Sequence, residues 1–373
     1  MMNRSEGAFR LRQPSAMTPY AHEHLMLNLL GRAAVWGDGV ADIQPAAFVD
    51  LCRRHRVAGL VYQRAGRGMA RAEEILPGLK ETAHKTLVDN LILLKALHEV
   101  AAVLSEEGIG FVLLKGVSLL GFLYPEIQLR PMTDLDLLIR EKDWPKVTDT
   151  LKARSYRLPT EDEERHFSEV WYHQLIETPG TPSTNLEFHW NLESVERSRI
   201  DPEELIRDAV PCEIEGESFL RLSDDHLLLH LATHLAHHYQ SPTLVWVEDL
   251  RRLLGKGRFD WERIGRTARA WGVENCLAYS LGYAERAFPG TLPPEAGRFR
   301  LSAGRNFILG AFRTENPVLP HRPLEGRPIR HAVSMLLLDR WRDAARYIVV
   351  HAFLRTTHAA SHPRSLPRFT GKP

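Results

Sequence analysis

Two aspartates spaced by one residue open the apolar segment TDLDLLI, residues 133–139. Side chains two residues apart point to the same face of a β-strand, so Asp134 and Asp136 project together while the adjacent leucines point into a core. Two like charges placed side by side cost free energy unless a cation joins them. Carboxylate oxygens are ligands that Mg²⁺ prefers, so the pair predicts a magnesium site. For the triplet alone, a solvated strand end is the alternative.

The segment IGFVLLKG, residues 109–116, ends in a lysine and a glycine. A glycine between a buried strand and a helix lets the backbone approach a phosphate group, and a helix N-terminus offers free N–H groups. Gly116 therefore predicts a phosphate-binding turn, to which Lys115 would add a charge and Ser118 a hydroxyl. Arg130 is close enough along the chain to line the same pocket. The alternatives are an ordinary strand-to-helix turn, whose lysine extends along the surface, and a surface arginine.

A third acid, Glu187, lies in the segment NLEFHW, residues 185–190. Alternation along a strand places Glu187 and His189 on one face and apolar residues on the other. One carboxylate beside an acidic pair suits a two-metal centre, which clamps the attacking and leaving oxygens of a phosphoryl displacement. Glu187 would bind a metal or act as general base. An edge-strand pair that faces water is the alternative.

Histidines recur at helical spacing in the segment SDDHLLLHLATHLAHHYQ, residues 223–240. This histidine stripe consists of His226, His230, His234 and His237. It indicates, in order of preference, packing against the neighbouring domain, contact with a nucleotide or acceptor, or a metal site, because histidines at i and i+4 can bind a transition metal. Asp249, in VWVEDLRRLL, would orient an acceptor or the stripe, or belongs to a solvated charge cluster.

The elements that must position these residues fall into four stretches. Residues 1–105 and 223–355 show helical periodicity, residues 106–222 alternate strand and helix, and residues 356–373 form a basic, proline-rich tail that we expect to be flexible. We therefore expect an α+β protein with a small mixed sheet between N- and C-terminal helical domains. Strands are expected over IGFVLLKG, TDLDLLIR, WYHQLIETPG and TNLEFHWNLES, and a short helix over VSLLGFLYP.

Composition argues against several classes of protein. The net charge of +1 over 373 residues gives no broad electrostatic footprint for long nucleic acid or an anionic membrane. Three distant cysteines form no CxxC pair, which argues against a disulfide framework and a zinc ribbon. No secretory signal and no apolar run of ~18 residues is present, so we expect a cytoplasmic protein. The GxSxG, GxGxxG and GxxxxGK[ST] motifs are absent.

The segment LLKGVSLLGFLYPEIQLRPMTDLDLLI, residues 113–139, resembles the signature of the uncharacterised nucleotidyltransferase family, within the DNA-polymerase-beta-like superfamily. It is similar, more loosely, to aminoglycoside and lincosamide nucleotidyltransferases. The shared order is a strand, a Gly-containing turn, a short helix, an arginine, DxD on the next strand and a later carboxylate. The chain departs from the superfamily at its turn, which reads Lys-Gly-Val-Ser where a Gly-Ser or Gly-Gly pair is usual.

The resemblance implies a polymerase-beta-like core that transfers an NMP from an NTP to an acceptor and releases pyrophosphate. Asp134 and Asp136 would bind Mg²⁺, in two ions, and Glu187 would be the third acid. The expected nucleotide contacts are Lys115, Gly116, Ser118 and Arg130. We expect ATP as the NTP, and the acceptor stays open between a small molecule, a peptide, a protein and an RNA end. Two other functions fit: a non-catalytic nucleotide- or partner-binding protein on the same fold, and a histidine-centred metal-dependent hydrolase.

Overall fold

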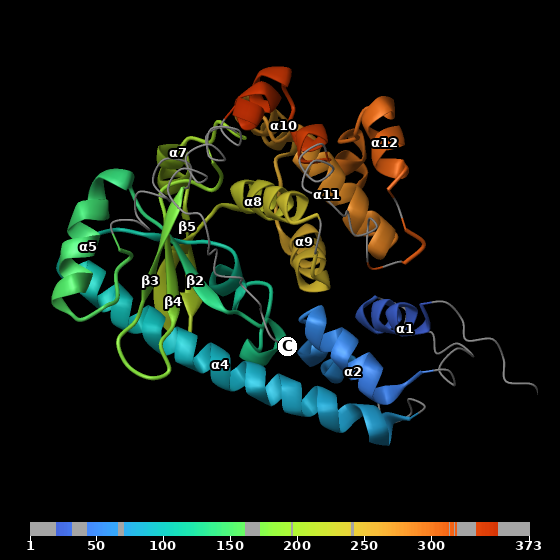
Figure 1. The fold of residues 1–373 in the computed structure, drawn as a ribbon, viewed down its shortest axis with the longest axis horizontal. Helices are drawn as coiled ribbons and strands as arrows, with labels where there is room; N and C mark the ends of the chain where they lie inside the picture. The colour runs from blue at the N-terminus through green and yellow to red at the C-terminus, as the bar shows by residue number, and fades with distance from the viewer. Residues whose placement is uncertain are drawn as a thin grey trace, which may run out of the picture.

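The computed structural model describes residues 20–31, 43–65, 71–160, 172–194, 197–239, 242–312, 314–316, 318 and 333–349. The predicted flexible tail, residues 356–373, lies outside them. The described part combines many helices with one mixed sheet (Figure 1). The prediction of an α+β protein with a mixed sheet is therefore confirmed.

Four helices precede the sheet, and they are α1 (Ala21–Leu30), α2 (Pro45–Arg54), α3 (Ala58–Arg64) and α4 (Ala72–Glu106). The helices between and after the strands are α5 (Trp144–Ala153), α7 (Pro202–Arg207), α8 (Asp224–His237), α9 (Leu244–Lys256), α10 (Trp261–Trp271), α11 (Glu274–Ala287) and α12 (Ala303–Gly310). Single 3₁₀ turns form η2 (Gly116–Leu119), η3 (Ile127–Leu129), η4 (Glu141–Asp143) and η5 (Pro294–Arg298). Residues 333–337 and 341–349 are also helical.

The strands are β1 (Val112–Leu113), β2 (Asp134–Leu138), β3 (His173–Glu177), β4 (Asn185–His189), β5 (Val210–Ile214) and β6 (Glu217–Arg221). They form one sheet in the order β3-β4-β2-β1-β6-β5. β2 pairs with β4 in parallel and with β1 antiparallel, while β1 pairs with β6 in parallel. The two strands that carry the predicted acids are thus direct neighbours at the centre of the sheet.

Alternating side chains give the central strands one apolar and one polar face. Leu135 and Leu137 of β2 are fully buried, and their register partners on β4 are Leu186 and Phe188. Trp144 at the start of α5 packs against Phe188, with ring centroids 6.0 Å apart. Because successive residues of a strand face opposite ways, the acids of β2 and β4 project from the other face.

The hairpin β5–β6 was missed, since our sequence analysis assigned no strand to residues 210–221. Glu215 and Gly216 form its two-residue turn, and both have positive φ angles, 50° and 84°. That backbone is typical of a tight hairpin, in which glycine is favoured. Pro211 interrupts the apolar pattern, and it is accommodated because β5 lies at the edge of the sheet.

The short helix expected over VSLLGFLYP is smaller than predicted. Only η2 forms, as a single 3₁₀ turn that ends at Leu119. Residues 121–123 continue as a turn, and the Gly121 amide donates to the Tyr124 carbonyl at 2.9 Å. The glycine in the middle of the segment therefore ends the helix before Pro125 is reached.

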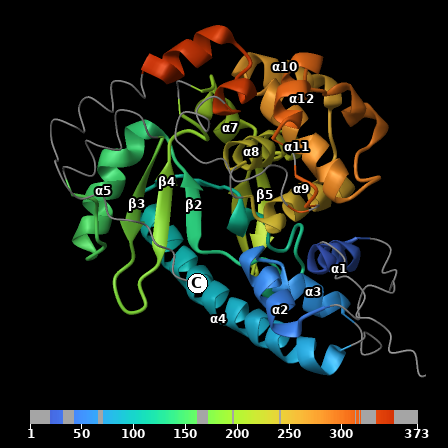
Figure 2. The same ribbon diagram turned by 45° about the vertical axis from the view of Figure 1, so that its right-hand side comes forward.

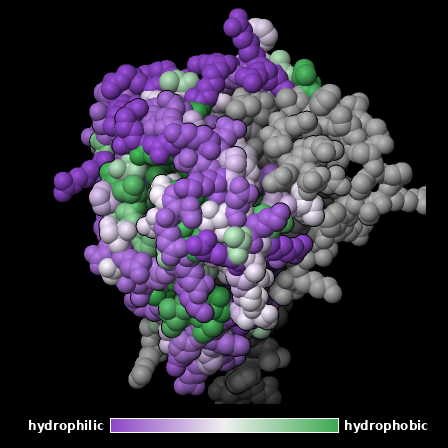
Figure 3. Space-filling model, turned by 90° about the vertical axis from the view of Figure 1, so that its left-hand side faces the viewer, coloured by the Kyte–Doolittle hydropathy of each residue, from purple (hydrophilic) through white to green (hydrophobic). Residues whose placement is uncertain are grey.

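The helices surround the sheet unevenly. In Figures 1 and 2, α4 runs the length of the sheet and on towards α2 and α3, while α8 and α9 stand on the side of β2 away from α5. The side of the molecule that carries α5 is mostly hydrophilic, with apolar residues in small separate patches (Figure 3). Among the helices described, none combines the length and the apolar composition that a membrane crossing requires.

Candidate active site

The register of β2 and β4 brings two of the predicted acids together. Asp136 lies opposite Glu187 in the parallel pair, and Asp134 lies opposite Asn185. Asp136, Glu187 and His189 each offer one ligand atom, and these atoms lie within 4.8 Å of one another. Two carboxylates and an imidazole at this spacing can hold a divalent cation, because oxygen and nitrogen ligands bind such ions at about 2.0–2.2 Å.

Lys115 supplies a positive charge to this acidic cluster. Its Nζ lies 2.8 Å from Oδ1 of Asp136. Burial alone would lower the pKa of Lys115, but the charges of Asp136, Glu187 and Asp134 outweigh it and raise that pKa. The lysine is therefore a permanent cation within this acidic cluster.

The two aspartates respond differently to these surroundings. Burial followed by the Asp136 charge raises the pKa of Asp134 to about 6. Burial would also raise the pKa of Asp136, but Lys115 and the hydrogen bond from His189 lower it well below its usual value. Asp136 is thus ionised at neutral pH. Burial and the neighbouring Asp136 charge disfavour the ionised form of Asp134, and a bound cation would favour that form.

His189, predicted only as a secondary residue, contacts both acids. Its Nε2 lies 2.9 Å from Oδ1 of Asp136 and 3.5 Å from Oε2 of Glu187. Burial lowers the pKa of His189, but its hydrogen bonds to the two carboxylates outweigh burial and raise it. His173, the register partner of His189 on β3, stacks on it with ring centroids 4.8 Å apart. Our sequence analysis missed His173, whose only signal is its place at the start of an expected strand.

Gly116 and Ser118 lie in the turn that follows Lys115. Gly116 has a φ of 29°, a backbone conformation that favours glycine. Ser118 is fully buried, and its Oγ has no hydrogen-bond partner within the described residues. The Ser118 hydroxyl is therefore enclosed by the fold, while the turn that contains Gly116 directly follows Lys115.

Arg130 was predicted to contact nucleotide, and the structure places it in a buried ion pair instead. Its Nε and Nη2 donate to the carboxylate of Asp249 at 2.7–3.0 Å, and its Nη1 donates to the Pro131 carbonyl. The Tyr124 hydroxyl donates to the same carboxylate at 2.6 Å. Asp249 is completely buried, so it is neither a solvated surface charge nor open to an acceptor. All three guanidinium nitrogens of Arg130 are engaged, which leaves none directed to a phosphate.

The histidine stripe divides among several environments. After burial, the Lys115 ammonium affects the pKa of His230 and of His234 most strongly, and both values fall, that of His230 to about 3. Both rings are therefore near enough to Lys115 for its charge to act on them. His234 also packs edge-on against Trp246, with ring centroids 4.8 Å apart. No metal-capable group among the described residues contains two histidines of the stripe, which removes support for a histidine-centred metal site.

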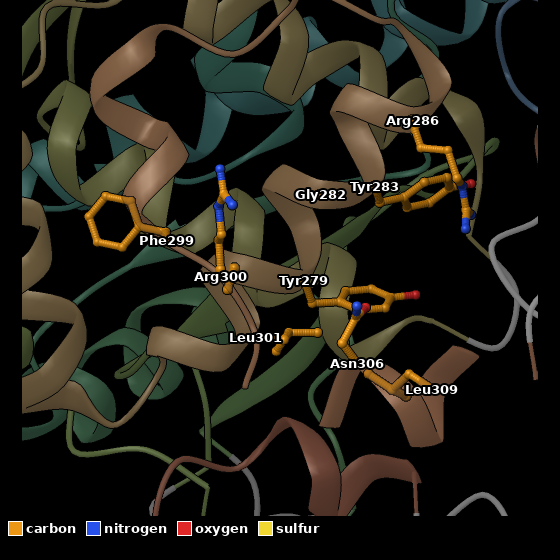
Figure 4. A pocket seen from close by; sticks show the side chains of 10 residues that line it. Tyr279, Gly282, Tyr283, Arg286, Phe299, Arg300, Leu301, Asn306 and Leu309 are labelled. Atoms are coloured by element: carbon orange, nitrogen blue, oxygen red, sulfur yellow. The ribbon is translucent and has the colours of Figure 1, made fainter. Parts of the chain in front are cut away.

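A separate pocket lies in the C-terminal helices. It has a volume of about 370 Å³ and is lined from α11 and the residues around α12, including Tyr279, Arg286 and Asn306 (Figure 4). None of the predicted site residues lines it, and it contains no carboxylate. The acidic cluster of the sheet, not this pocket, is therefore the candidate active site.

Comparisons with known proteins agree with the geometry at the level of the family. A sequence model described as "Uncharacterised nucleotidyltransferase" matches residues 41–289. No curated protein matches the chain. One similar solved structure is an antigenic nucleotidyltransferase-like protein from Paracoccidioides brasiliensis, with 14% identity over 47% of this chain and 76% of that one. Its TM-score of 0.29 is too low to add to the assignment. The family match covers well over half of the chain, and the chain therefore belongs to the uncharacterised nucleotidyltransferase family.

Proposed function

We propose that the protein transfers an NMP from an NTP to an acceptor in a Mg²⁺-dependent reaction. An acceptor oxygen or nitrogen would attack the α-phosphorus, the bond between the α-phosphorus and its bridging oxygen would break, and pyrophosphate would leave. The observation that carries the proposal is the parallel register of Asp136 and Glu187, beside Lys115. Family membership supports nucleotidyl transfer in general terms.

The residues present fit a magnesium ion. Asp136 and Glu187 offer carboxylate oxygens within one ligand sphere, and burial followed by the charge of Asp136 raises the pKa of the nearby Asp134. We propose that Asp134, Asp136 and Glu187 hold the ion or ions. Bound Mg²⁺ would neutralise charge on the triphosphate as the α-phosphorus is attacked.

The protein's own residues would carry out the remaining tasks. Lys115 would turn from Asp136 to a phosphate oxygen, and the backbone at Gly116 would lie against the triphosphate. Glu187 would accept the proton that the acceptor loses, because it is the more exposed of the two paired acids. Ser118 and Arg130 have no part in this proposal, since one is enclosed and the other is committed to Asp249.

The test is transfer of an α-phosphate label. The full-length protein is incubated with each α-labelled NTP, Mg²⁺ and an extract of host cells, and the labelled acceptor is separated. The wild type and Asp149→Asn, a change at an exposed aspartate, should label the same molecule equally. Asp136→Asn should not label it while remaining folded. Undiminished labelling by Asp136→Asn would contradict the proposal.

A non-catalytic nucleotide-binding protein is the second candidate, and one observation favours it. Oδ1 of Asp136 already contacts both the Lys115 ammonium and the His189 ring nitrogen, so this carboxylate has polar partners without an ion. If Lys115 stays there, the protein would bind NTP equally well with and without Mg²⁺ and would release no pyrophosphate. Isothermal titration of each NTP, with and without Mg²⁺, separates the two functions.

A further inference from the structure

A second group of acidic and histidine side chains shares no residue with the candidate active site. It lies where α7 meets the start of α8 (Figure 1). Glu204 is in α7, Asp208 follows the last residue of α7, and His226 is in the first turn of α8. One ligand atom from each lies within 4.8 Å of the others.

His226 is the unusual member of this group. It is completely buried, and neither ring nitrogen has a hydrogen-bond partner within the part of the chain described. A buried polar atom without a partner costs free energy, so a bound ion between these side chains would offset that cost. The ring is held in place by stacking on Trp271, with centroids 5.3 Å apart and planes at 27°.

The distances suit an ion between the side chains. Nε2 of His226 is 3.8 Å from Oε1 of Glu204, which is too far for a hydrogen bond. Tetrahedral bonds of about 2.0–2.2 Å place two ligand atoms about 3.3–3.6 Å apart, so the two side chains would close by a few tenths of an ångström around the ion.

The surrounding charges are compatible with a cation. Asp208 accepts from Arg207 and from Arg263, each at 3.2 Å and each on a different oxygen. A carboxylate has about four lone-pair positions, so both contacts leave room for ligation, and ligating carboxylates are commonly held by such second partners. Arg263 is also shared with Asp225, at 3.4 Å.

We propose that Glu204, Asp208 and His226 form a structural site for one divalent transition-metal ion of the Zn²⁺ class. Imidazole with carboxylates favours Zn²⁺ over Mg²⁺, which prefers oxygen ligands alone. The ion would fasten α7, which leads into the hairpin β5–β6, to α8, which carries the histidine stripe. The ion would thus stabilise the junction between the sheet and the C-terminal helices. This proposal does not depend on the proposed catalysis.

The experiment titrates metal-free, full-length protein with Zn²⁺ in the presence of excess Mg²⁺. Asp136→Asn, which removes a ligand from the acidic cluster of the sheet, should keep the Zn²⁺ site at His226. Glu204→Gln should weaken binding about tenfold or more. Glu203→Gln is the matched control, because Glu203 is the preceding residue of α7 and faces Arg140 instead. It should bind Zn²⁺ as the wild type does.

His226→Phe gives a second readout that does not require binding energies. Phenylalanine keeps the stack on Trp271 and removes the two unpartnered nitrogens, so the metal-free variant should melt no lower than the metal-free wild type. Zn²⁺ should raise the Tm of the wild type and leave that of His226→Phe unchanged.

Three results with the variants would overturn the proposal. They are wild-type Zn²⁺ affinity in His226→Phe, loss of Zn²⁺ binding in Asp136→Asn with retention in His226→Phe, and equal weakening in Glu203→Gln and Glu204→Gln. The absence of Zn²⁺ binding by the wild type would do the same. None of these readouts depends on NMP transfer.

Discussion

Asp136 and Asp249 are both buried, with 2% and 0% of their surface exposed, but their partners differ. Asp249 is held by the planar fork of Arg130 and by the Tyr124 hydroxyl. Asp136 is held by the single ammonium of Lys115 and by an imidazole, beside a second carboxylate. A guanidinium group binds a carboxylate through two nitrogens at once. An ammonium group on a flexible side chain makes a single contact, which another ligand of the carboxylate can replace.

The comparison separates an acid with structural contacts from the acid that we propose to be functional. Asp249 joins α9 to the segment 124–130 that leads into β2, and its contacts leave no position for a ligand. Asp136 has contacts that a cation or a phosphate could replace. Burial alone does not distinguish the two, but the identity of the partner does.

Asp249→Asn should have the largest effect, and on stability. Removing one member of a buried ion pair leaves the other charge uncompensated, which costs about 3–5 kcal/mol of the free energy of unfolding. Urea denaturation measures this loss. Tyr124→Phe, which removes one hydrogen bond and no charge, should cost about 1 kcal/mol. If Asp249→Asn unfolds at the same urea concentration as the wild type, Asp249 does not stabilise the fold and this account of it is wrong.

Lys115→Met should lower kcat/KM for the NTP about 10²-fold, or about 2.7 kcal/mol, because the triphosphate loses a point charge. Lys115→Arg should not restore the rate, since a guanidinium would lock onto Asp136 as Arg130 does onto Asp249. Pyrophosphate release gives both values, and Lys142→Met, at an exposed lysine, is the control. Full activity in Lys115→Arg would show that the residue at position 115 does not have to leave Asp136 to bind a phosphate oxygen.

Asp134→Asn should stabilise the metal-free protein at neutral pH. The folded state raises the pKa of Asp134 to about 6 from an ordinary 3.8, so between these values the folded state binds more protons than the unfolded state. Stability contributed by this group therefore falls as the pH rises from about 4 to 6, and it stays lower above that. With a discount for partial exposure, the variant should gain about 1–2 kcal/mol near pH 7.

Denaturation of both proteins across this pH range, without Mg²⁺, checks the sign. The difference between Asp134→Asn and the wild type should vanish below about pH 3, where the aspartate is protonated in both states. A variant that is less stable than the wild type at neutral pH would contradict the account of crowded negative charge.

Ser118→Ala should have the smallest effect. The hydroxyl is enclosed and makes no hydrogen bond with a described residue, so its loss removes an unpartnered polar group and should leave the variant at least as stable as the wild type. The KM for the NTP should change by less than about twofold. A tenfold rise in KM would restore Ser118 as a nucleotide contact.

Local patterns predicted the faces of the central strands well. The alternation in TDLDLLI and NLEFHW gave the correct side for Asp136, Glu187 and His189. The pairing of β2 with β4 was expected only by analogy, because register depends on contacts between segments about fifty residues apart.

Local sequence patterns did not predict contacts between residues that lie far apart in the sequence. Arg130 lies four residues before Asp134 in the sequence, which suggested a shared pocket, yet its partner is Asp249, 119 residues further along. The pairing of β1 with β6 was missed for a related reason, since the strand that precedes β6 contains a proline and resembles a loop. Sequence spacing predicts which side chains share a face, and tertiary packing decides which of them meet.

Changing the ligand at position 136 tests the central claim most directly. Asp136→Cys replaces a hard oxygen with a soft sulfur, which binds Cd²⁺ in preference to Mg²⁺. In the α-label assay, we predict no transfer by this variant with Mg²⁺ and renewed transfer to the same acceptor with Cd²⁺. Transfer by Asp136→Cys with Mg²⁺ at the wild-type rate would contradict a metal ligand at this position.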